Sequence, residues 1–89
     1  MSPEAARILI ESGLVMIGTD RLSVDDSQAS DYGVHKLFLE ANCVIIEGLS
    51  LADVDPGWYN LVALPLRFEG AEASPARILL TPTASTPPV

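Results

Sequence analysis

The sequence predicts a small α/β fold, in which a strand–helix–strand unit is followed by a C-terminal β-hairpin. Four apolar residues recur at the spacing of one helix face: Val34, Leu37, Phe38 and Ala41. They predict a helix over residues 31–42, with Ser30 or Asp31 as its cap. Apolar runs over 14–18 and 43–47 flank this helix and predict two buried strands. Strands joined by a helix pair in parallel through a right-handed crossover, and this gives the fold class.

A further helix is predicted at the start of the chain. Ser2 offers a capping hydroxyl, Pro3 suits the first helical position, and Glu4 complements the helix dipole. Gly13 is the residue at which we expect this helix to end, because glycine readily adopts the left-handed conformation of a helix C-terminus.

Two strand-like segments follow the central unit, at 58–68 and 77–81, and predict an antiparallel hairpin. Pro65 lies inside the first of them and indicates an edge strand or a bulge, because proline cannot donate a ladder hydrogen bond. Trp58 and Tyr59 open that strand. We expect them to pack in the core, with stacking against a substrate as the alternative.

A chain of 89 residues allows one small domain, which we place at residues 1–80, with a flexible tail over 81–89. Twelve acidic residues against five basic ones give a net charge of −7. This balance excludes a nucleic-acid binder and an anionic membrane surface as partners, because both need clustered Lys and Arg.

The remaining bulk features predict a cytoplasmic protein. Neither an apolar run of about 20 residues nor a basic signal sequence is seen, so no membrane span is expected. Cys43 is the only cysteine and cannot form an internal disulfide, which fits a reducing compartment. We interpret it as a small buried hydrophobic residue, with a reactive thiol as the alternative.

The only histidine, His35, and a glutamate at the end of a strand, Glu47, are expected to meet at one edge of the fold. Residues 35 to 42 rise roughly 10 Å along the helix, and residues 43 to 47 return roughly 13 Å along the strand. The two lengths nearly cancel, so both side chains reach the carboxyl end of that strand. Open α/β sheets place their ligands at this edge.

An imidazole and a carboxylate in this arrangement suit a zinc site or a general acid–base pair. The alternative is structural, because a lone histidine and a glutamate after a strand are more often solvated or satisfied locally. Two ligands are also fewer than the three that a catalytic zinc normally takes from its protein. Asp20, Asp25 and Asp26 are further oxygen donors, although a dense acidic loop is more often simply solvated.

Three segments together resemble the C-terminal half of the cyclase family of metal-dependent hydrolases, of which kynurenine formamidase is the best-known member. They are "GTDRLSVDD", "VHKLFLEANCVIIEGLSLADV" and "LVALPLRFEGAEASPARILL". The resemblance runs in order from Leu14 to Leu80. It implies that the chain is part of a kynurenine formamidase-like, swivelling β/β/α fold.

The resemblance also implies a function. It places His35 and Glu47 among the metal ligands of the family, for zinc or manganese, and it assigns no catalytic or substrate-binding residue in this chain. The implied reaction is hydrolysis of a small-molecule amide, as in N-formylkynurenine plus water to kynurenine and formate, or of a related amide or lactam. In the loop Gly18, Asp20, Ser23 and Asp25, it implies hydrogen bonding around the site and no ligation.

Two departures from the family pattern change the expectation. The histidine-rich "HxGTHxDxPxH" motif of the N-terminal half is absent, and Gly48 replaces the asparagine that tends to follow the glutamate. We therefore expect the C-terminal portion of an enzyme, inactive alone, that needs an N-terminal half to bind metal. Association with such a half, or a homo-oligomer, is the expected assembly.

Two alternatives remain. The chain could be a non-catalytic fragment or an interaction subunit that completes another chain. It could also be a free-standing acid–base enzyme that uses His35 and Glu47, which we rank below the other two.

Overall fold

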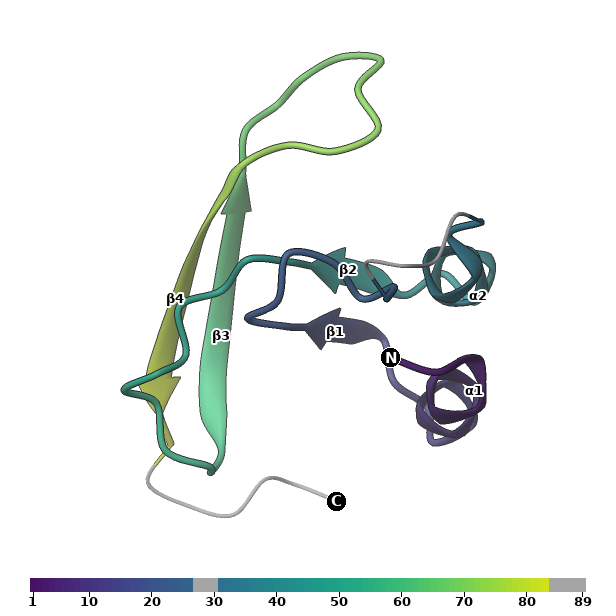
Figure 1. Ribbon diagram of the computed structural model, residues 1–89. Coiled ribbons are helices and arrows are strands. Elements are labelled where there is room, and N and C mark those ends of the chain that lie inside the picture. The colour runs from purple at the N-terminus through teal and green to yellow at the C-terminus, as the bar shows by residue number, and fades with distance from the viewer. Residues whose placement is uncertain (27–30, 84–89) are drawn as a thin grey trace. The chain divides into compact units, whose positions relative to one another are not determined.

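A computed structural model describes residues 1–26 and 31–83, and the chain divides into two compact units, Met1–Asp53 and Val54–Val89 (Figure 1). We call them the first unit and the hairpin unit and describe each by itself. The described residues form two α-helices and two two-stranded sheets, so the predicted α/β class is confirmed. No helix in this described part of the chain is long and apolar enough to cross a membrane.

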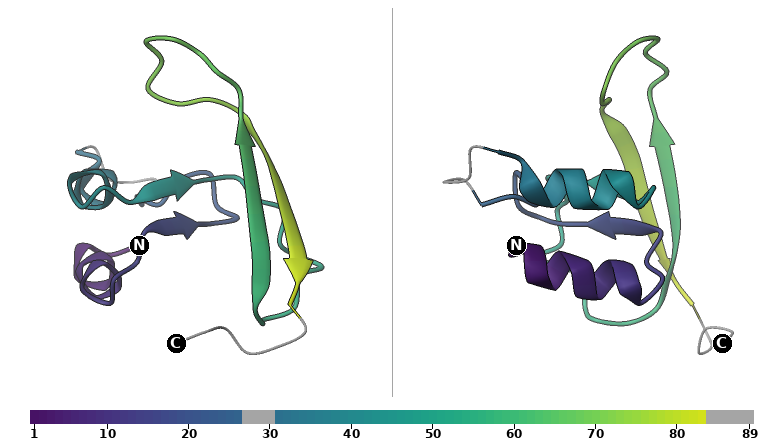
Figure 2. Two further views of the ribbon diagram at one scale, coloured as in Figure 1. Left: turned by 180° about the vertical axis from the view of Figure 1, so that it is seen from behind. Right: turned by 90° about the vertical axis from the view of Figure 1, so that its right-hand side faces the viewer.

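The first unit contains all the helices and the parallel strands. Its elements are α1 (Pro3–Glu11), β1 (Met16–Gly18), α2 (Gly33–Glu40) and β2 (Val44–Ile46). The strands β1 and β2 are parallel, as the sequence predicts, with Ile17 opposite Ile45. The two helices run side by side next to this pair (Figure 2).

Helix α1 begins and ends where the sequence places it. The Ser2 hydroxyl accepts a hydrogen bond of 3.1 Å from the Ala5 backbone N–H, and Pro3 is the first helical residue. At the other end, the Gly13 N–H donates to the Ile10 carbonyl, and Gly13 has a φ of +93°, a conformation that favours glycine.

Helix α2 is shorter than predicted, and its start is different. The residue that precedes it is Tyr32, which has a φ of 54° and no side-chain cap, so the prediction of Asp31 as the capping residue is wrong. The Asp31 carboxylate instead accepts the Gly33 N–H at 3.2 Å, and Ser30 lies outside the described residues. The next two N–H groups of α2, those of Val34 and His35, donate to the side chain of Asp25.

The core of the first unit lies between the helices and the β1–β2 pair. Five apolar residues are buried: Ala6, Val24, Val34, Phe38 and Cys43. Cys43 is 3% exposed, which confirms the prediction of a small buried residue, and its thiol donates to the Leu14 carbonyl.

The hairpin unit consists of β3 (Tyr59–Pro65) and β4 (Ala76–Pro82). The strands are antiparallel in an unbroken register from Tyr59 opposite Pro82 to Pro65 opposite Ala76, so no bulge interrupts them. The predicted hairpin is therefore confirmed, with Pro65 at the end of its strand.

Both ends of the hairpin differ from the sequence-based expectation. Trp58 is 63% exposed, so the expectation that it packs in a core is wrong. The Thr83 N–H donates to the Trp58 carbonyl, which means that the first residues of the predicted tail, 81–83, are paired. The rest of that tail, 84–89, lies outside the described residues, and the domain over 1–80 stays a prediction.

Candidate functional site

The structure brings His35 and Glu47 together. His35 is the third residue of α2, and Glu47 directly follows β2. Their Nε2 and Oε2 atoms lie 2.9 Å apart, with 21% and 29% of the two side chains exposed. The convergence that helix rise and strand length predict is therefore observed.

A second carboxylate holds the other side of the same ring. Asp25 Oδ2 lies 2.5 Å from His35 Nδ1, so the imidazole stands between two carboxylates. Asp25 is 6% exposed, whereas Asp20 and Asp26, the other oxygen donors considered from the sequence, are exposed. The structure thus distinguishes Asp25 from its acidic neighbours.

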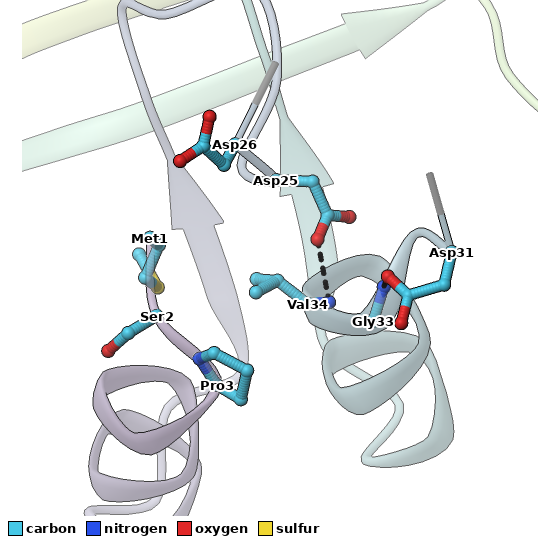
Figure 3. Close-up of a pocket in the computed structure, with 8 residues that line it drawn as sticks. All are labelled: Met1, Ser2, Pro3, Asp25, Asp26, Asp31, Gly33 and Val34. Carbon is cyan, nitrogen blue, oxygen red and sulfur yellow. Dashed lines mark hydrogen bonds between the residues drawn. The ribbon is translucent and has the colours of Figure 1, made fainter. Parts of the chain in front are cut away.

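Asp25 also completes the N-terminus of α2. Its carboxylate accepts the backbone N–H of Val34 at 2.9 Å (Figure 3). It also accepts the backbone N–H of His35 at 3.1 Å. Free N–H groups at the start of a helix need acceptors, and the dipole of the helix favours a negative charge there. The capping group of α2 therefore comes from a loop nearly ten residues earlier in the chain.

These contacts keep Asp25 ionised. Burial on its own would raise the pKa of this carboxyl, because the charged form loses hydration. The hydrogen bonds from the His35 ring and from the backbone N–H groups of Val34 and His35, with the attraction of the ring, outweigh that effect. The pKa of Asp25 is consequently lowered from its ordinary value of 3.8.

The loop before α2 fixes both carboxylates through its backbone. The Asp25 N–H donates to the Ser23 hydroxyl at 3.1 Å, and the Val24 N–H donates to Glu47 Oε2 at 2.8 Å. Val24 is 2% exposed, so its buried side chain anchors this loop in the core. The hydrogen-bonding role expected of Ser23 and Asp25 is confirmed.

This arrangement is chemically suited to one part of a metal site. Histidine ligands commonly give one ring nitrogen to a carboxylate and the other to the metal, and here Asp25 takes Nδ1 and leaves Nε2 toward Glu47. Two ligands of a tetrahedral zinc with bonds of ~2.0–2.1 Å lie roughly 3.3 Å apart. The observed 2.9 Å is shorter and is the distance of a direct contact between the two side chains, so the pair would have to open slightly to hold a metal ion.

The described residues do not complete such a site. Within residues 1–26 and 31–83, no group of three or more His, Cys, Asp or Glu side chains is placed to hold a metal ion. His35 and Glu47 fit as a pair of ligands, and a catalytic zinc normally needs at least one more from protein. Their role as metal ligands stays a prediction.

A pocket of about 350 Å³ lies on another side of Asp25, between the starts of α1 and α2 (Figure 3). Eight residues line it: Met1, Ser2, Pro3, Asp25, Asp26, Asp31, Gly33 and Val34. His35 and Glu47 are not among them, so the pocket is distinct from the candidate ligand pair and identifies no substrate.

Sequence reasoning missed the contact between Asp25 and His35, although it named both residues. No periodic pattern indicates this contact, because Asp25 lies in an irregular loop. Tyr32, directly before α2, has no short side chain that could cap the helix. The Val34 and His35 N–H groups near the start of α2 donate to Asp25 instead.

Known proteins resemble this chain over most of its length. No family model matches the chain. The kynurenine formamidase of Salinibacter ruber is 39% identical over 80 residues, which are 90% of this chain and 38% of the relative. The kynurenine formamidase of Sphingopyxis alaskensis is 48% identical over 68 residues, 76% of this chain and 32% of the relative. The chain thus spans little more than a third of these curated relatives.

Solved structures agree with the sequence relatives. A potential metal-dependent hydrolase with cyclase activity superposes with a TM-score of 0.81 at 40% identity, over 89% of this chain and 39% of its own. A predicted metal-dependent hydrolase from Bacillus stearothermophilus superposes with a TM-score of 0.80 at 40% identity, over 89% of this chain and 38% of its own. The resemblance seen in the sequence is confirmed: over this shared stretch the chain is a homologue of the kynurenine formamidases and cyclase-type metal-dependent hydrolases.

Proposed function

We propose that this chain supplies part of the metal centre of an amide hydrolase that resembles kynurenine formamidase. His35 Nε2 and the Glu47 carboxylate would be ligands for zinc or manganese, and the other ligands would come from a polypeptide segment that this chain does not contain. The observation that carries the proposal is the imidazole held by Asp25 on one side and facing Glu47 on the other.

The chain's own residues would position the ligands. Asp25, buried and ionised, fixes the His35 ring through Nδ1, so the orientation of Nε2 is set before any ligand binds. The Val24 N–H holds one oxygen of Glu47 and limits the rotation of this carboxylate. Such a preformed pair lowers the entropic cost of binding a cation.

The proposed reaction is N-formylkynurenine plus water to kynurenine and formate, a step in tryptophan breakdown, or the hydrolysis of a related amide or lactam. It is supported by two homologues named kynurenine formamidase. A divalent cation in such a site supplies a Lewis acid and a water whose pKa is lowered from 15.7 to about 7. The proposal includes a complete protein with the swivelling β/β/α fold, located in the cytoplasm and assembled as a homo-oligomer or from two halves.

The isolated chain should be inactive. Two ligand side chains leave the coordination of a catalytic metal incomplete, and no group of three side chains placed to hold a metal ion is found among the described residues. Zinc or manganese would therefore bind only weakly until a second polypeptide segment contributes its own ligands.

Reconstitution tests this proposal. The chain is mixed with the part of the Salinibacter ruber relative that it does not match, zinc or manganese is added, and kynurenine release from N-formylkynurenine is followed. We expect activity from the mixture and from neither component alone. The variant His35→Asn should abolish that activity, whereas Lys36→Gln, an exposed neighbour on α2, should retain it.

A covalent fusion of the two components serves as a second format, because it does not depend on their association. An inactive fusion that is folded and loaded with metal would exclude the hydrolase proposal. The two matching pieces of the Salinibacter ruber protein, joined in the same way, provide the positive control.

The second candidate is a non-catalytic interaction subunit. It is favoured by the absence of a third metal-ligating side chain beside His35 and Glu47 in the described part of the chain. Zinc affinity separates the two candidates, since a subunit without metal chemistry would bind zinc equally weakly before and after it associates with its partner.

A further inference from the structure

The two strands of the hairpin unit carry apolar side chains on both faces. Successive residues of a strand point to opposite faces, and paired residues share a face. Leu61 therefore lies on one face with its partner Leu80, and Val62 lies on the other face with its partner Leu79. Arg77 is the only charged residue in either strand.

This pattern is unusual for a hairpin in water. An antiparallel sheet with one wet face normally alternates apolar and polar residues, whereas strands covered on both sides are apolar throughout. A two-stranded hairpin alone is also marginally stable. The residues of β3 and β4 are therefore those of strands inside a larger sheet structure.

The apolar side chains are accessible. Leu61 is 43% exposed, Val62 46%, Leu64 54% and Leu79 43%, and no residue of 54–83 is buried. Leu66 and Phe68, just after β3, are also exposed, at 57% and 53%. Exposed apolar surface, where it is extensive, marks an interaction site in soluble proteins.

We infer that both faces of β3–β4 form a docking surface for the polypeptide that carries the rest of the family fold. The inference rests on the proposed function and adds the surface by which the second segment binds. The solved homologue superposes on 89% of this chain with a TM-score of 0.81, yet only 39% of that homologue is used. More than half of a homologous chain is therefore left to cover these strands.

A second copy of this chain is a poorer occupant. A two-fold symmetric contact places the same surface patch of each copy against the other. Such a contact would cover one face of the hairpin and leave the opposite apolar face in water. A longer polypeptide can cover both faces at once.

Binding without metal tests the inference. The chain is titrated with the unmatched part of the Salinibacter ruber relative in the presence of EDTA, and the dissociation constant is measured by calorimetry. We expect a one-to-one complex. Val62→Lys should weaken it by at least about tenfold, because a charge would be buried without a partner. Val62→Thr keeps a β-branched strand residue and should weaken it less.

The matched control is Ala73→Lys, which adds the same charge at an exposed residue of the loop between the strands and should leave the affinity unchanged. The two complementary pieces of the Salinibacter ruber protein serve as the positive control. If those pieces associate and this chain does not bind, or if Val62→Lys and Ala73→Lys bind equally well, the inference is wrong. Sedimentation of the chain alone as a dimer that Val62→Lys dissociates would also overturn it.

The two proposals fail in different ways. A complex that forms through the hairpin but hydrolyses no amide would remove the proposed function and leave the docking surface intact. An active covalent fusion whose separate pieces do not associate would do the reverse.

Discussion

The first unit and the hairpin unit differ in how their apolar residues are used. In the first unit, Phe38 is fully buried and Val34 is 2% exposed, so the helix spacing of its sequence produces a core. In the hairpin unit, residues just as apolar stay accessible, and Leu64 is 54% exposed. The first unit therefore has a core of its own, although Val15 and Leu22 in it are also exposed, at 76% and 94%, whereas no described residue of the hairpin unit is buried.

The candidate ligands belong to the unit that has a core. Asp25, His35 and Glu47 lie in the first unit and are held by buried backbone and by one another. Residues that must be placed accurately are better supported by packed elements than by accessible ones. Under the two proposals above, the first unit positions the metal ligands and the hairpin unit binds the polypeptide that carries the rest of the fold.

The largest expected effect of a single substitution falls in the core of the first unit. Phe38→Ala should lower the free energy of unfolding by about 3–5 kcal/mol, because it removes a buried ring and leaves a cavity. Leu39→Ala is the matched control on the same helix, at a residue that is 59% exposed, and should have little effect. Urea unfolding followed by far-UV circular dichroism measures both. Equal losses for the two variants would contradict the assignment of a core to this unit.

The next effect concerns the link between α2 and the site. Asp25→Asn keeps the size of the side chain but removes its negative charge. The Asp25 carboxylate accepts three hydrogen bonds, from the Val34 N–H, the His35 N–H and the His35 ring. We expect a loss of about 2–3 kcal/mol in the free energy of unfolding, since hydrogen bonds to charged groups are the stronger ones. Asp20→Asn, in the exposed part of the same loop, is the control. A loss no greater than that of Asp20→Asn would mean that Asp25 does not stabilise the helix start.

The same residue predicts a dependence on pH. Because the pKa of Asp25 is lowered by folding, its contribution is fully present above its unfolded pKa of about 3.9 and is lost as the pH falls through the folded value. The difference in unfolding free energy between the natural chain and Asp25→Asn should therefore shrink from about pH 5 to about pH 2. A difference that stays constant would show that the carboxylate charge contributes nothing.

Much of the fold could be predicted from local patterns. Ser2, Pro3 and Gly13 mark α1 because caps and turns depend on near neighbours. The parallel pairing of β1 with β2 followed from the helix between them, and the hairpin from two apolar runs around a turn. The start of α2 could not be read in this way, because its capping group comes from a distant loop and Tyr32 carries no capping signal.

The candidate site was predicted only in part, because one of its contacts depends on regular elements and the other on an irregular loop. Helix rise and strand length are regular, so the approach of His35 to Glu47 could be calculated from residue counts. The contact between Asp25 and the His35 ring depends on the path of an irregular loop, and no periodic pattern in the sequence predicts that path. Trp58 was expected in a core because tryptophan is usually well covered, yet it is 63% exposed in the described part of the chain.

The smallest expected effect tests the hairpin directly. Leu64→Ala should change the free energy of unfolding of the isolated chain by no more than about 0.5 kcal/mol, because its side chain is already 54% exposed and little burial is lost. After the complementary polypeptide binds, the same substitution should cost about 2 kcal/mol or more, since the side chain would then be enclosed. The measurement is denaturant unfolding of the chain and of the complex, with Leu39→Ala as the control in both. If the loss of unfolding free energy caused by Leu64→Ala does not rise on binding, Leu64 lies outside the interface. The exposed apolar residues of the hairpin unit would then not be explained by binding of the second polypeptide.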